Sequence, residues 1–153
     1  MSRTPYAANT TVTVEKSQAE VTAILRKYGA NRFGTMEDEK SAYLMFDFKG
    51  LSVQMDVPLP PLSEFSRTET GRPRAMTQQE EARSQAIKQR WRALVLAVKA
   101  KLEAVEIGIS TVEKEFMAFV MMPDGRQLSD HVLPVLGEMV KTGKMPLMLG
   151  GPK

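Results

Sequence analysis

Basic residues gathered between Gly71 and Glu103 are the side chains of this chain whose type and spacing could do recognisable chemistry, namely binding phosphate. This segment has a net charge of +5, whereas the whole chain of 153 residues has +3. A positive segment in a slightly negative frame attracts polyanions, and such binding falls with salt because counterions are released. The sequence therefore predicts a nucleic-acid-binding site formed by Arg72, Arg74, Arg83, Lys88, Arg90, Arg92, Lys99 and Lys101. The alternative is a solvated helix whose basic stems cover the edge of a core.

Residues that could support catalysis are few. The chain has no cysteine and one histidine, His131, which excludes a thiol nucleophile and a zinc site with thiolate ligands. Asp47 and Asp56, on neighbouring predicted strands, could meet across a hairpin and recruit Lys49 for magnesium-dependent chemistry. The sequence has neither a GxxxxGK[ST] loop nor a GxGxxG turn after a strand. We therefore expect a protein that is not an enzyme and that has no cofactor.

A long helix from Thr77 to Gly108 is expected to position the basic residues, with Thr77 and Glu80 forming its capping box. Bulky apolar residues recur at helical spacing on one side of this segment, which predicts that Trp91 belongs to the core. The opposite side carries a row of alanines, which permits close approach of another helix and predicts possible homo-oligomers through that face. The bulky stripe is Trp91, Leu94, Val95, Val98, Leu102 and Val105, and the alanine row is Ala86, Ala93, Ala97, Ala100 and Ala104.

Alternating apolar and polar residues predict an antiparallel hairpin, with strands at Ala42–Phe48 and Leu51–Val57 and one buried face. Arg32–Met36 is expected to be a weaker strand, and Val12–Val14 a short one. Because the strands come early and the helices late, the predicted fold class is α+β: a small antiparallel sheet with a long central helix and two or three shorter helices.

The shorter helices are predicted from capping residues and apolar spacing. One begins at a capping box of Ser17 and Glu20 and ends at Gly29, and another is capped by Thr111. The segment Phe116–Met122 fits either a helix or a strand, because both periodicities are present. After a turn at Pro123-Asp124-Gly125, Ser129 is expected to cap a last helix, with Pro134 inside its first turns.

One domain of residues 11–144 is expected, with a flexible arm at 1–10, a long loop at 58–75 and a flexible tail at 145–153. The first ten residues lack the pattern of a signal peptide, and no stretch reaches the roughly 18 apolar residues of a membrane span. We therefore expect a cytoplasmic protein without a membrane partner.

The chain resembles a family of short, functionally uncharacterised proteins encoded by bacteriophages, prophages and integrating elements. The resemblance implies the setting of a mobile genetic element in a bacterial cytoplasm, and it implies no activity or site residue. That setting and the basic segment together favour a non-enzymatic nucleic-acid-binding accessory protein, with an inhibitor or adaptor of a host protein complex as the alternative. The matching segments are Val14-Glu15, Leu25–Ala30, Arg90–Leu94, Lys99–Glu106, Glu115–Met117, Pro123–Arg126 and Thr142–Pro146.

Overall fold

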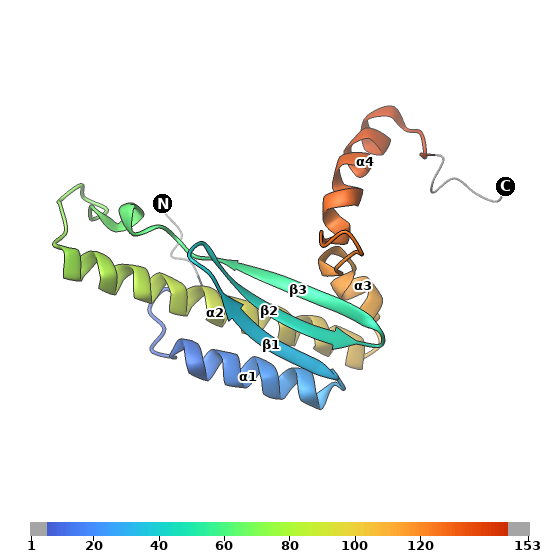
Figure 1. Cartoon of the computed structure of the whole chain (residues 1–153), viewed down its shortest axis with the longest axis horizontal. Coiled ribbons are helices and arrows are strands. Elements are labelled where there is room, and N and C mark those ends of the chain that lie inside the picture. Colours follow the sequence, from blue (N-terminus) through green and yellow to red (C-terminus); the bar gives the residue numbers. More distant parts are fainter. Residues whose placement is uncertain (1–5, 147–153) are drawn as a thin grey trace.

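A computed structural model describes residues 6–146 and shows an α+β fold (Figure 1). The predicted fold class is confirmed. The α-helices are α1 (Val14–Lys27), α2 (Met76–Glu106), α3 (Val112–Phe116) and α4 (Leu128–Thr142), and the strands are β1 (Arg32–Glu37), β2 (Ser41–Phe48) and β3 (Leu51–Pro58). Short 3-10 helices η1 (Leu62–Phe65) and η2 (Met117–Phe119) complete the elements of the described residues.

The sheet is antiparallel in the order β1-β2-β3, as the alternating pattern predicted. Its register pairs inward-facing residues across the hairpin, among them Leu44 with Met55 and Phe46 with Val53. Lys49 and Gly50 form the connecting turn, and both have positive φ angles of 47° and 79°. Such a two-residue turn matches the twist of the strands, and it fixes the register that turns one apolar face inward.

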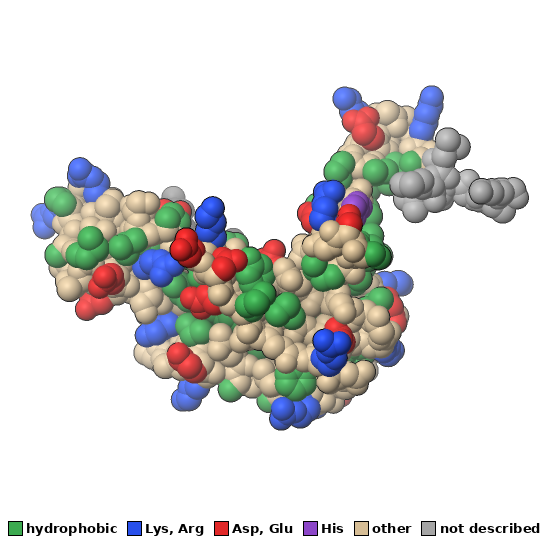
Figure 2. Space-filling view, in the orientation of Figure 1, with side chains coloured by type: hydrophobic (Ala, Val, Ile, Leu, Met, Phe, Trp, Pro, Cys, Tyr) green, Lys and Arg blue, Asp and Glu red, His purple; other side chains and the backbone are tan. Residues whose placement is uncertain are grey.

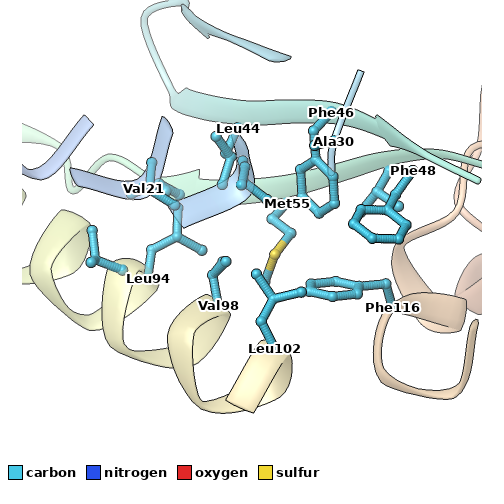
Figure 3. Close-up of a cluster of buried hydrophobic side chains, with 14 of the residues drawn as sticks. Val21, Ala30, Leu44, Phe46, Phe48, Met55, Leu94, Val98, Leu102 and Phe116 are labelled. Atoms are coloured by element: carbon cyan, nitrogen blue, oxygen red, sulfur yellow. The ribbon is translucent and has the colours of Figure 1, made fainter. Parts of the chain in front are cut away.

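The core lies between that apolar face and two helices, α1 and α2 (Figure 3). Trp91, Val95 and Val98 of α2 are fully buried, so the bulky stripe faces inward as predicted. Phe116 of α3 closes the end of this core and meets Phe46 edge to face, with ring centroids 5.3 Å apart. Burying large aromatic side chains contributes about 3–5 kcal/mol each by comparison with alanine.

Helix starts differ from the predicted capping boxes. In α1 the side chain of Thr13 caps the helix by accepting from the Lys16 N–H at 3.2 Å, and the expected cap, Ser17, is buried in the first turns. The predicted strand at Val12–Val14 is therefore wrong. Helix α2 starts one residue before Thr77, because Gln78 accepts from the Ala75 N–H at 3.1 Å.

The segment after α3 resolves the open choice between helix and strand. Residues Met117–Phe119 form η2, and Val120 and Met121 then make isolated bridges with Val53 and Gln127. Both periodicities had a physical basis, since a short helical turn runs directly into an extended segment on the edge of β3.

Ser17 supplies a test of packing between α1 and the rest of the core. Its hydroxyl is fully buried and has no hydrogen-bond partner among the described residues. We expect Ser17→Ala to raise the free energy of unfolding by about 1 kcal/mol, because an unsatisfied buried hydroxyl is removed and alanine favours a helix. Urea denaturation followed by circular dichroism measures this change.

The matched control is Ser84→Ala, at an exposed position of α2, where only the helix propensity changes. The control is expected to gain slightly in stability, so a loss of stability in Ser17→Ala would show that the buried hydroxyl makes a stabilising contact.

Candidate interaction surface

Three of the predicted phosphate-binding arginines hold the chain between β3 and α2. The guanidinium of Arg90 donates to the Pro58 carbonyl at 2.6 Å, and that of Arg83 donates to the Pro60 carbonyl at 2.8 Å. Arg74 donates to the Arg67 carbonyl at 3.0 Å. Because an irregular segment leaves carbonyls without ladder partners, these charged donors satisfy groups that the loop itself cannot.

Two further members of the predicted set form intramolecular ion pairs. Arg92 binds the Glu20 carboxylate through both terminal nitrogens, at 2.5 and 2.9 Å, and so joins α2 to α1. This hydrogen-bonded guanidinium lowers the pKa of the Glu20 carboxyl below 4.5. Lys101 lies 3.5 Å from the Glu115 carboxylate and also donates to the Glu115 carbonyl at 3.0 Å.

The remaining three residues, Arg72, Lys88 and Lys99, make no ion pair or side-chain hydrogen bond within residues 6–146. Lys88 and Lys99 share one side of α2 but lie about 16 Å apart along its axis. Lys88 also shares a shallow depression with Glu80 and Glu81. Figure 2 shows basic and acidic side chains interspersed on the visible face of the body. The eight predicted residues therefore differ in their contacts: five make contacts within the chain, and three make no ion pair or side-chain hydrogen bond among the described residues.

A different surface is formed by α4, which projects from the body as an arm (Figure 1). Its base is a tight connection, in which the Leu128 N–H donates to the Val120 carbonyl and the Met121 N–H donates to the Ser52 carbonyl, both at 2.8 Å. The side chain of Gln127 adds a bond of 2.8 Å to the Gln54 carbonyl. The arm is thus tied to the edge of β3 at its first turn.

The start of α4 corrects the predicted cap. The helix begins at Leu128, with the Asp130 carboxylate accepting from the Gln127 N–H at 3.1 Å, so Ser129 is not its cap. Pro134 is the seventh residue of the helix and lies within its first two turns, as predicted. The carbonyl of Asp130, which loses its helical donor at Pro134, accepts from Arg126 at 3.4 Å. The helix continues to Gly143, whose positive φ of 67° ends it.

Apolar side chains of α4 are exposed. Within the described structure none of its fifteen residues is buried, and the exposed fractions are 61% for Leu133, 44% for Leu136 and 79% for Val140. We call Ser129, Leu133, Leu136 and Val140 the α4 seam, because they follow one another along one side at intervals of four, three and four residues. Figure 2 shows hydrophobic side chains along the arm.

A small apolar pocket lies at the base of the seam. It has a volume of about 120 Å³ and is bounded by η2 on one side and the first turns of α4 on the other. Its lining includes Met117, which is 54% exposed, and Leu133. An apolar pocket of this kind suits one aliphatic side chain of a bound polypeptide.

The alanine side of α2 faces outward. Ala93, Ala97 and Ala100 are exposed, and Leu96 among them is 43% exposed. This side agrees with the predicted alanine face.

The catalytic candidates do not come together. The strand register places Asp47 opposite Ser52 and Asp56 opposite Tyr43, so the expected meeting of the two carboxylates is wrong. His131 lies 2.8 Å from Asp124 in the turn before α4. In residues 6–146 no group of three or more histidines and carboxylates could hold a metal ion. In the same range, no helix combines the length and apolar character needed to cross a membrane.

The predicted flexible ends are described only in part. Residues 6–10 lie against α2, where Gln85 donates to the Thr10 carbonyl at 2.8 Å and Gln89 donates to the Tyr6 carbonyl at 3.0 Å. The predicted tail extends beyond Pro146 and there lies outside the described residues.

Periodicity alone could not reveal the exposed α4 seam. The apolar positions of this helix were recognised in the sequence, but amphipathic spacing does not tell whether a face is covered by the same chain. Comparisons with protein-family models, with curated proteins and with solved structures found no match to this chain.

The Arg92–Glu20 pair predicts a defined pH dependence. We expect Glu20→Gln to lower the free energy of unfolding by about 1 kcal/mol at pH 7, because a partly exposed bidentate pair is lost. Since the folded pKa of Glu20 is depressed, its contribution is present above 4.5 and disappears as the pH falls through the lowered value. Urea denaturation of both proteins between pH 7 and pH 3 measures the convergence.

Glu81→Gln, at an exposed site of α2, serves as the control and should show no such convergence. A stability difference between Glu20→Gln and the native chain that stays constant to pH 3 would contradict the assignment.

Proposed function

We propose that this chain is a protein-interaction module that binds another polypeptide through α4. The observation that carries the proposal is a fifteen-residue amphipathic helix that projects from the body with its seam exposed. Exposed contiguous apolar side chains on one helix face are typical of a binding surface.

Helix energetics support this proposal. Isolated helices of this length are marginal in water, and most helices depend on packing of an apolar face. Pro134 and Gly137 lie inside α4, and such residues cost roughly 3 and 1 kcal/mol relative to alanine in a helix interior. A bound polypeptide covering the seam would supply the packing that this sequence does not supply by propensity.

The tied base supports the same function. Hydrogen bonds from Leu128, Met121 and Gln127 hold the first turn of α4 against β3. A partner therefore meets a face whose orientation is fixed before binding, which reduces the entropy lost on association.

Photo-crosslinking tests this function. A benzoylphenylalanine at position 136, on the seam, should form adducts with protein when the chain is expressed in bacterial cells. The matched control is the same group at Glu138, which lies on the opposite side of α4. Adducts of equal yield at both positions, or adducts that nuclease removes, would contradict the proposal.

Nucleic-acid binding is a second proposal, supported by the net charge of +5 between Gly71 and Glu103. The available cations for it are Arg72, Lys88 and Lys99, since the other five serve internal contacts. Fluorescence polarisation at low salt with single- and double-stranded DNA and RNA should then show binding that falls steeply with added salt. The triple alanine variant at these three positions should lose most of it.

The same assay on Leu136→Asp separates the two proposals, because a substitution on α4 leaves these cations in place. Absence of binding to every nucleic acid at low salt would overturn the second proposal.

A further inference from the structure

We propose that α4 binds α4 of a second copy of this chain, in antiparallel orientation. This inference rests on the proposed function, because it names the polypeptide that covers the seam. It differs from the predicted oligomer through the alanine row, since the surface used lies on the arm and not on α2.

The seam is complementary to itself when the two helices run in opposite directions. Its intervals of four, three and four residues are those of helices that pack side by side. With the two-fold axis between the central residues, Leu133 of each copy faces Leu136 of the other. The outer positions then pair Ser129 of each copy with Val140 of the other, so that a large side chain meets a small one at each end.

The pocket at the base of α4 fits this register. It is lined by Ser129 and Leu133 together with Met117 of η2. In the antiparallel pair the side chain that arrives there is Val140 of the second copy. Val140 is 79% exposed in the single chain, compared with 61% for Leu133 and 44% for Leu136. One small apolar pocket and one protruding aliphatic side chain are therefore placed to meet twice in the same dimer.

Charge selects the antiparallel orientation. Asp130 lies near the beginning of α4 and Lys141 near its end, and helical spacing puts both on the same margin of the seam. Antiparallel pairing brings the carboxylate of one copy and the ammonium of the other to the same margin at each end of the pair, whereas parallel pairing places the same margin of the two copies on opposite sides of the interface and forms no such contact. The helix dipoles favour the same arrangement.

The shape of the molecule permits the pair. Gly137 lies on that same margin, faces open space in the single chain and has no side chain, so a second helix can approach closely there. The arm of about 22 Å joins the body at its first turn and extends away from it (Figure 1). In an antiparallel pair the two bodies lie at opposite ends of the joined arms.

Sedimentation equilibrium of the purified chain is the first test. We expect a concentration-dependent mass rising toward twice 17.1 kDa. Leu136→Asp should weaken the dimer at least 100-fold, and Glu138→Gln, on the opposite side of α4, should leave it unchanged. Circular dichroism of both variants shows whether the fold is retained.

Disulfide trapping tests the orientation, because the native chain has no cysteine. We expect an equal mixture of Ser129→Cys and Val140→Cys chains to give predominantly the mixed disulfide, with little homodimer from either chain alone. Predominant homodisulfides would show parallel pairing and overturn the proposal.

A monomer at all concentrations would also overturn the self-pairing. In that case adducts between benzoylphenylalanine at position 136 and a different protein would still support the proposed function. The absence of a dimer together with the absence of any protein adduct would contradict both the self-pairing and the proposed function.

Discussion

The fold depends on covering the single apolar face of a three-stranded sheet. The two-residue turn at Lys49-Gly50 sets the register, and the register decides that Leu44, Phe46 and Met55 face the helices. A shift of one residue would turn this set toward water, so the core, the position of α2 and the attachment of α3 all depend on it. Only α2 is long enough to extend past the sheet at the end where the loop from β3 returns (Figure 1).

That extension explains why basic residues of α2 form hydrogen bonds within the chain. The chain between β3 and α2 is irregular, and from α2 Arg83 reaches back to the Pro60 carbonyl in this chain and Arg90 to the carbonyl of Pro58 at the end of β3. Arginine suits this task because its long stem can lie along apolar surface while the planar guanidinium keeps several donors available. A positively charged segment therefore need not bind an external anion, because backbone carbonyl oxygens near the segment can accept hydrogen bonds from the same side chains.

The sequence allowed the strands, the inward stripe of α2 and the turn before α4 to be predicted because each has a local signature. Period-two alternation identified β2 and β3, and Gly29 marked the end of α1. The helix caps were predicted less accurately. Thr13 and Ser17 are chemically alike, and only packing decides which one is buried and which one caps the helix. The partners of Arg92 and Arg90 are 72 and 32 residues away, and no local pattern records such distances.

The same limit applies to the candidate site, because the sequence of α4 predicts a helix but not whether its apolar side is covered. Its spacing is equally compatible with a core helix of one chain and with an interface between chains, because both bury an apolar side. What distinguishes the two is where the chain places the helix, and here the bridge between Met121 and Gln127 directs it away from the sheet. If the seam is covered only after association, the stability of α4 becomes dependent on protein concentration, whereas that of the sheet and α2 does not. The base of α4 stays fixed by its hydrogen bonds to the body, and assembly stabilises the turns beyond it, where Pro134 and Gly137 weaken the helix in the single chain.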